Sequence, residues 1–116
     1  MEEVRFSVPA IPPTANHYVV HTRKGLHFRT PEARRFDERV ALSAGNLRGR
    51  HLEAKEVDII LWLPPNKRGD VDNFIKVGID SLVRCGVIQS DASITRLLVE
   101  KHRLETPQTD FYIRWE

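Results

Sequence analysis

The chain has 116 residues, 41% of them hydrophobic and 29% charged, which excludes the intrinsically disordered, collagen-like and coiled-coil classes of protein. A net charge of +2, from 18 basic and 16 acidic residues, excludes a histone-like polycation, and no apolar run approaches the roughly 18 residues of a membrane helix. The acidic N-terminus is unlike a signal peptide and the lone Cys85 fits a reducing compartment, so we expect one cytoplasmic domain spanning residues 1–116.

The first elements are predicted to be strands. Residues Val4–Val8 alternate apolar and polar side chains and then meet Pro9, a pattern typical of a short strand stopped by a breaker. Two short extended pieces, residues 18–20 and 26–28, flank a basic turn that contains Gly25. We expect them to form a hairpin.

A helix is predicted next, over residues 31–44. Thr30 offers an N-cap and Pro31 stands at the first helical position, where its missing N–H costs nothing. No breaker follows until Gly45. The apolar residues recur three or four apart, as on one face of a helix: Ala33, Phe36, Val40, Ala41 and Ala44.

The second half of the chain predicts one helix among three strands. The β-branched and aromatic run at residues 57–63 reads as a buried strand, central in its sheet, and a helix over 72–84 ends at Gly86. Residues 94–104 and 111–115 read as two closing strands. This order predicts an α+β fold class, with a mixed β-sheet and two main helices packed on it.

The second helix carries the strongest chemical pattern. Asp72, Lys76 and Asp80 recur at four-residue steps along one stripe, and Asp70 stands just before the first turn. A separate apolar stripe is expected to face the core: Val71, Ile75, Ile79 and Leu82. Neighbouring carboxylates repel each other, by on the order of 1 to 4 kcal/mol. Mg²⁺ or a lysine would compensate, and Mg²⁺ prefers oxygen ligands together with substrate phosphate.

Asp91 supplies a third carboxylate from the loop that follows this helix. Spacing alone leaves open whether that loop folds back onto Asp70. Spacing also leaves structural alternatives open. Asp70 can simply cap the helix, Asp72 and Lys76 can form an ordinary i, i+4 ion pair, and Asp91 can belong to a turn. Asp80 is better explained as a solvated helix residue than as a ligand.

Basic residues surround these acids in the sequence, and clusters of this kind suit contacts with phosphate groups. They are Lys67 and Arg68 before the second helix, Arg34, Arg35 and Arg39 on the first, Arg48 and Arg50 after it, and Arg23 and Lys24 in the hairpin. The five histidines show no metal-ligand spacing, and among them only His17 is a weak candidate for the site. Glycine-rich phosphate loops, nucleophile elbows and zinc signatures are missing from the sequence.

Several of these motifs together resemble the RusA family of Holliday-junction resolvases, small endonucleases that cut four-way DNA junctions. The resemblance covers nearly the whole chain. It rests on Pro12-Pro13-Thr14-Ala15-Asn16-His17-Tyr18, on Pro31-Glu32-Ala33, on Asp70-Val71-Asp72-Asn73-Phe74-Ile75-Lys76 with Asp80-Ser81-Leu82, and on Gly86-Val87-Ile88-Gln89-Ser90-Asp91.

This resemblance implies that Asp70, Asp72 and Asp91 bind Mg²⁺, with Mn²⁺ as the alternative ion, and that Lys76 assists catalysis. It also implies a homodimer, since a two-fold protein can place two active centres on symmetry-related strands of a junction. The residues expected to contact DNA are Lys67, Arg68, Asn73, Arg34, Arg35 and Asn16.

One departure from the family pattern concerns the second acidic site. The family usually has two adjacent acids there, and the first is Ser90 in this chain. The expected function is a Mg²⁺-dependent endodeoxyribonuclease that resolves four-way junctions by paired nicks in recombination and repair. The alternatives are a catalytically weakened junction- or DNA-binding module, which Ser90 motivates, and a nuclease for other branched or duplex DNA.

Overall fold

The computed structural model describes residues 1–13, 19–21, 27–68 and 71–116, with the backbone alone for residues 19–21, 27–28 and 71–73. Both predicted helices are confirmed to within one residue. In chain order the elements are β1 (Glu2–Val8), β2 (Val19–His21), β3 (His27–Arg29), α1 (Pro31–Ala44), the short 3-10 helix η2 (Gly45–Leu47), β4 (Ala54–Leu63), α2 (Val71–Arg84), β5 (Arg96–Arg103) and β6 (Gln108–Trp115).

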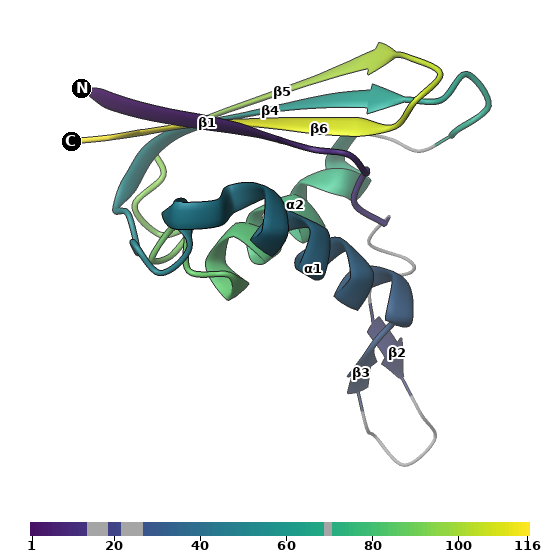
Figure 1. Ribbon diagram of the computed structural model, residues 1–116, viewed down its shortest axis with the longest axis horizontal. Helices are drawn as coiled ribbons and strands as arrows, with labels where there is room; N and C mark the ends of the chain where they lie inside the picture. The colour runs from purple at the N-terminus through teal and green to yellow at the C-terminus, as the bar shows by residue number, and fades with distance from the viewer. Residues whose placement is uncertain (14–18, 22–26, 69–70) are drawn as a thin grey trace.

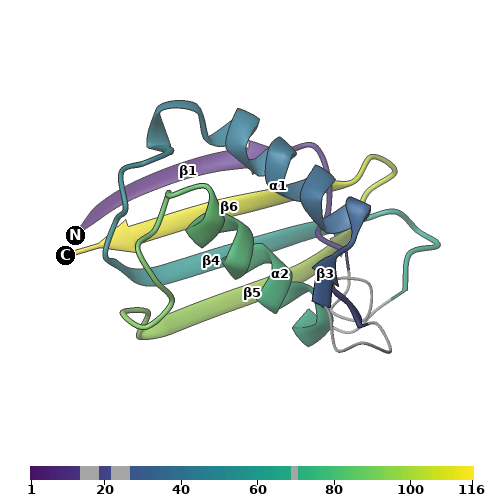
Figure 2. The ribbon, with the colours of Figure 1, turned by 90° about the horizontal axis from the view of Figure 1, so that it is seen from below.

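A four-stranded mixed sheet forms one layer, and α1 and α2 both cover the same face of it (Figure 1 and Figure 2). The strand order is β1-β6-β4-β5, in which β4 and β5 are parallel and the other pairs are antiparallel. The hairpin of β2 and β3 stands apart from this sheet. These features confirm the predicted α+β class, the hairpin, and the interior position of the strand that contains residues 57–63.

The core lies between the sheet and the two helices. Along β4, Val57, Ile59, Leu61 and Leu63 are at most 1% exposed, and Phe36 of α1 is 2% exposed. The alternate β4 residues are half-buried on the opposite face. Each large side chain buried in this way stabilises the fold by about 1.5–3 kcal/mol relative to an exposed one.

Local signals account for the bounds of α1. The backbone N–H of Ala33 donates a hydrogen bond to Thr30 Oγ1 at 3.2 Å, so Thr30 is the N-cap that the sequence predicts. Such a cap contributes about 1 kcal/mol. The helix ends at Gly45, whose φ of 55° is a conformation that glycine adopts at little cost.

Strands β4, β5 and β6 differ from their predicted bounds. β4 begins at Ala54, three residues early, because the polar residues that open it pair within the ladder. β5 begins at Arg96 because Ile94 belongs to a turn, in which its N–H donates to the Asp91 carbonyl at 3.1 Å. β6 begins at Gln108, opposite Trp62 of β4.

The predicted apolar stripe of α2 is partly wrong. Ile79 and Leu82 of that stripe are buried as predicted, but Phe74 and Val77, which lie outside it, are fully buried as well. Ile75 is only half-buried, so the face that meets the sheet is rotated from the predicted one. Among the described residues, no helix has the length and apolar character needed to cross a membrane.

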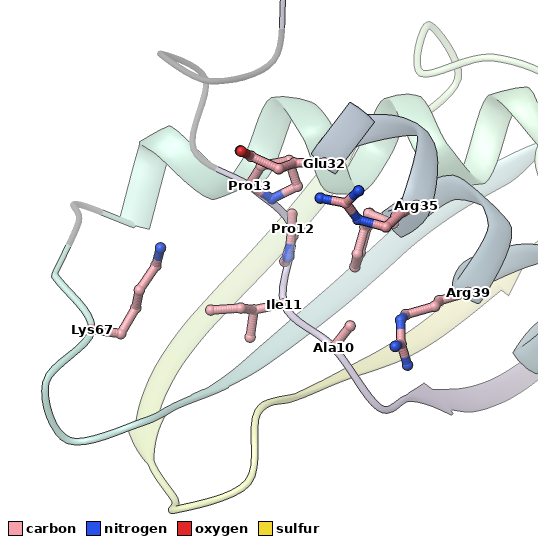
Figure 3. Close-up of a pocket in the computed structure, with 9 residues that line it drawn as sticks. Ala10, Ile11, Pro12, Pro13, Glu32, Arg35, Arg39 and Lys67 are labelled. Atoms are coloured by element: carbon pink, nitrogen blue, oxygen red, sulfur yellow. The ribbon is translucent and has the colours of Figure 1, made fainter. Parts of the chain in front are cut away.

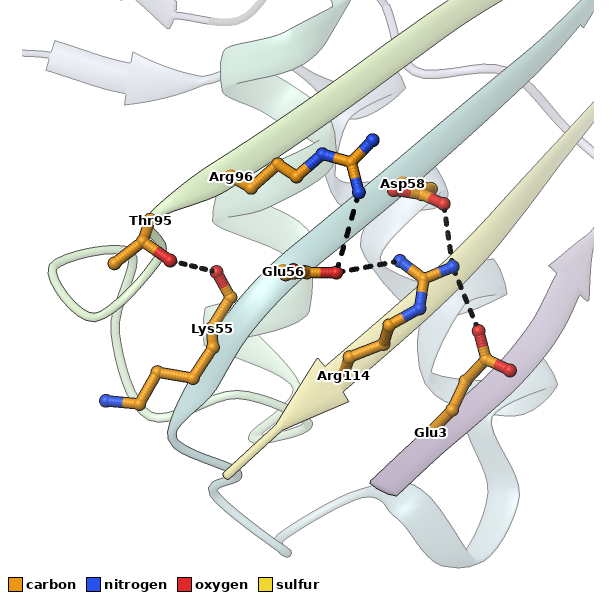
Figure 4. Close-up of polar contacts among 7 residues, drawn as sticks. All are labelled: Glu3, Lys55, Glu56, Asp58, Thr95, Arg96 and Arg114. Atoms are coloured by element: carbon orange, nitrogen blue, oxygen red, sulfur yellow. Dashed lines mark hydrogen bonds and ion pairs between the residues drawn. The ribbon is translucent and has the colours of Figure 1, made fainter. Parts of the chain in front are cut away.

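The sheet face opposite the helices carries an ionic network centred on Arg114 of β6 (Figure 4). Its guanidinium donates to Asp58 Oδ2 at 3.0 Å, and it lies 3.1 Å from Glu3 Oε1 and 3.5 Å from Glu56 Oε1. The hydrogen bond to Asp58 raises the pKa of Arg114. Arg114 therefore links its own strand, β6, to β1 and β4 through the carboxylates of those two strands.

A second polar cluster on this face is centred on Asp110 of β6. Its carboxylate accepts hydrogen bonds from Ser7 Oγ at 2.7 Å, Gln108 Nε2 at 2.7 Å and Trp62 Nε1 at 2.8 Å. Burial alone would raise the pKa of Asp110, but these three donors lower it below its ordinary value. The sheet face opposite the helices is thus polar near both ends of β6.

Candidate active-site groove

The helix α2 presents its charged stripe away from the core, as the sequence predicts. Lys76 is exposed and Asp80, one turn further on, is half-buried. Asp72 belongs to the same helix, four residues before Lys76, and the structure describes its backbone alone. Asp70 lies outside the described residues.

The loop that carries Asp91 is held against the start of β4 on both sides. Before it, the N–H of Gln89 donates to the Leu52 carbonyl at 2.8 Å. After it, Ser93 Oγ donates to the Ala54 carbonyl at 2.6 Å, and the N–H of Thr95 donates to the Lys55 carbonyl at 2.8 Å. Asp91 therefore occupies a defined place next to the sheet.

Ser90, which departs from the family pattern, has a structural contact. Its Oγ accepts a hydrogen bond from the backbone N–H of Ala92 at 3.0 Å. This is a Ser/Thr turn across Asp91, of the kind that serine and aspartate side chains both make. Serine at this position consequently preserves a turn that presents Asp91.

Lys76 and Asp91 line one groove between α2 and the beginning of β5. The groove has a volume of about 650 Å³ and also contains the carboxylate residue Asp80. Its remaining walls include Ile79, which is 6% exposed, and Leu97 of β5, which is 42% exposed. The fold therefore brings Asp91 to the same groove as Lys76, a relation that spacing along the chain could not establish.

The donor set of this groove suits a hard cation. Carboxylate oxygens from Asp80 and Asp91 are the ligands that Mg²⁺ and similar ions prefer. Within the described part of the chain, no group of three or more His, Cys, Asp or Glu residues is arranged to hold a metal ion. Of the three predicted ligands, only the Asp91 carboxylate lies within that part, because Asp72 is described by its backbone alone.

The predicted DNA-contact residues are divided between two regions. Lys67 and Arg68 lie in the loop from β4 to α2, and Arg34 and Arg35 are exposed on α1. Lys67 and Arg35 line a common pocket. The remaining candidates lie beyond what the structure describes: Asn16 and the weak candidate His17 as whole residues, and Asn73 in its side chain.

Two further charged residues, one that lines the groove and one at the contact between α1 and α2, were not predicted from the sequence. Arg96 lines the groove from β5 and lies 3.8 Å from Glu56. Asp37 of α1 accepts a hydrogen bond from the buried Ser81 of α2 at 2.6 Å and pairs with Arg29 of β3. No local signal marks either residue, because each acts through a partner that is distant in sequence.

Comparison with known proteins gives one match and one negative result. Residues 9–114 match the family model described as endodeoxyribonuclease RusA. No curated protein matches the chain.

Proposed function

The chain belongs to the RusA family of endodeoxyribonucleases, and from that premise we propose that it resolves four-way DNA junctions by metal-dependent, paired nicks. Membership implies an endodeoxyribonuclease of the Holliday-junction resolvase kind that binds DNA junctions. Resolvases of this family generally depend on a divalent metal. We assign the role to one domain over residues 1–116, acting in the cytoplasm.

The observation that carries the proposal is the shared groove of Lys76 and Asp91. A cation and a carboxylate from two different elements meet there, beside a helix that bears Asp72 one turn before Lys76. Helix capping explains neither the position of Asp91 nor its neighbourhood. Phosphodiester hydrolysis needs both kinds of group, since anionic ligands alone would repel the DNA strand.

The proposed roles follow from charge. Asp70, Asp72 and Asp91 would hold Mg²⁺, or Mn²⁺ in its place, which when bound supplies Lewis acidity and activates water. Lys76, which lines the groove, would stabilise negative charge that develops on the scissile phosphate. The attacking water gives up one proton to solvent as its oxygen bonds to phosphorus, the P–O bond to one sugar oxygen breaks, and that leaving oxygen takes a proton from solvent.

The assembly that fits paired nicks is a homodimer. A four-way junction has two-fold symmetry, so two copies of the groove related by the same symmetry can reach equivalent strands. We assign the DNA contacts outside the groove to Lys67, Arg68, Arg34 and Arg35, with Asn73 and Asn16.

The decisive experiment uses a synthetic four-way junction with Mg²⁺ and, separately, with EDTA. We expect the wild-type chain to nick symmetrical strands only with Mg²⁺, and Asp91→Asn and Lys76→Gln each to lower the rate by roughly 10²–10³. Glu105→Gln, an exposed acid in the turn before β6, is the matched control and should retain the wild-type rate. Wild-type rates for both groove variants would refute the proposed site.

Two rival functions are separated by the same assay. A binding module with weakened catalysis would bind the junction tightly and show no Mg²⁺-stimulated nicking. A nuclease for other DNA would cut flap or duplex competitors in preference to the junction. The Ser90 contact with Ala92 favours the active enzyme over the first rival, since it maintains the turn at Asp91.

A further inference from the structure

A second pocket, of about 310 Å³, lies between α1, the segment after β1 and the loop from β4 to α2. Its floor is apolar and includes Ile11 and Pro12. Figure 3 shows Lys67 on one side of this floor and Arg35 and Arg39 on the other. The pocket is therefore an apolar strip between two cationic walls.

The charges of these three cations are not offset by ion pairs within the described part of the chain. Among the described residues, no ion pair is formed by Arg35, Arg39 or Lys67. Of the described residues that line the pocket, Glu32 alone carries a carboxylate. Three positive charges minus one negative charge leave a formal charge of +2, which attracts an anionic ligand.

The two walls are held in place by different parts of the fold. Arg35 and Arg39 are one helical turn apart on α1, whose Phe36 and Val40 are buried in the core. Lys67 lies in a turn that Arg103 of β5 fixes, because its Nη1 donates to the Pro64 carbonyl at 3.1 Å and the Lys67 carbonyl at 2.7 Å. Each wall can keep its position when no ligand is bound.

A DNA strand has the alternation of charge and apolar surface that this pocket presents. Its phosphates are anionic, and the deoxyribose between two phosphates is largely apolar. The pocket also lies close to the proposed active centre, because α2 begins at Val71, four residues after Lys67. Chain geometry keeps those two Cα atoms within about 14 Å.

We propose that this pocket binds one nucleotide unit of the DNA backbone, a few nucleotides from the scissile phosphate. The deoxyribose packs on Ile11 and Pro12, one phosphate contacts Lys67, and the next contacts Arg35 and Arg39. The inference rests on the proposed nuclease function and assigns Arg39 and the apolar floor to substrate binding. Because every contact is to sugar or phosphate, the pocket positions the strand without reading its sequence.

The test measures junction binding in EDTA by fluorescence anisotropy, from 50 to 200 mM salt. Each phosphate contact contributes about 0.9 to the slope of log K against log salt, so one lost contact changes the salt effect over this range about 3.5-fold. We expect Lys67→Gln to reduce the magnitude of this slope by about 0.9. The double variant Arg35→Gln/Arg39→Gln should reduce it by at least that amount, and the triple variant should reduce it by the sum of the two effects.

Two further variants sharpen the result. Glu32→Gln removes the opposing charge and should tighten binding at 50 mM salt. Arg5→Gln removes one exposed cation from β1, beside Tyr112 on the face opposite the helices, and should leave affinity and slope unchanged. If Arg5→Gln and Lys67→Gln reduced affinity and the salt slope equally, the proposed binding pocket would be refuted. The cations would then act through a diffuse electrostatic field.

A parallel cleavage assay with Mg²⁺ keeps this inference separate from the proposed function. If the wild-type chain nicks the junction and the pocket variants keep the wild-type slope, the DNA-binding role of the pocket is refuted and the nuclease function is not. A wild-type chain that never nicks, with variants that lose the expected slope, supports the pocket and overturns the nuclease. A wild-type chain that does not bind the junction overturns both.

Discussion

Gly86 lies in the turn after α2, against the segment before β4. Its φ is 75°, and its carbonyl accepts a hydrogen bond from the N–H of His51 at 2.8 Å. A Cβ at this position would lie 3.1 Å from the backbone nitrogen of Gly49 and 3.2 Å from its Cα. Gly86→Ala therefore introduces both backbone strain and a steric overlap.

The two costs can be separated by a matched variant. Gly49 has nearly the same conformation, with a φ of 77°, but an added Cβ there meets no atom within 4 Å. A left-handed conformation costs a non-glycine residue roughly 1–2 kcal/mol, and overpacking against backbone adds about 1 kcal/mol or more. We expect a loss of unfolding free energy of about 1.5 kcal/mol for Gly49→Ala and about 2.5 kcal/mol for Gly86→Ala.

Urea denaturation at a fixed protein concentration, followed by tryptophan fluorescence, measures both losses. The corresponding falls in Tm are about 6 °C and 10 °C, at roughly 4 °C per kcal/mol for a domain of this size. Gly86→Ala should also slow junction cleavage more than Gly49→Ala, because the turn leads to the loop that carries Asp91. Equal destabilisation by the two variants would show that the close approach to Gly49 has no energetic effect.

Three further predictions concern charged and reactive side chains. The pKa of Asp110 is lower in the folded chain than its ordinary value of 3.8. The stabilising contribution of its carboxylate is therefore present above about pH 4 and is lost as the pH falls through the folded-state pKa. In urea denaturation, Asp110→Asn should be more destabilising at pH 7 than at pH 2.5. Arg114→Gln should lower the unfolding free energy by about 2 kcal/mol, and Arg114→Lys should recover less than half of that, because the guanidinium uses two nitrogens to reach three carboxylates and an ammonium has only one. A full recovery by lysine would contradict this account. Burial raises the pKa of the Cys85 thiol, so iodoacetamide at pH 8 should modify it roughly tenfold more slowly in the folded chain than in urea, as mass spectrometry can follow.

The sequence determined the features that depend on neighbouring residues. Thr30, Pro31 and Gly45 begin and end α1 through caps and backbone geometry that act within a few residues. The motif from Asp70 to Lys76 identified the family, which the match over residues 9–114 confirms. Charge spacing also placed Lys76 on the exposed side of α2.

The tertiary structure alone decided which distant residues meet. The burial of Phe74 and Val77 in addition to Ile79 and Leu82 of the predicted stripe depends on how α2 rests on the sheet. The approach of Asp91 to Lys76 depends on backbone hydrogen bonds between the loop after α2 and the segment before β4, some 35–40 residues away. Periodicity and capping are local, whereas these contacts form only when separate segments pack, so only the fold brings Asp91 and Lys76 to one groove.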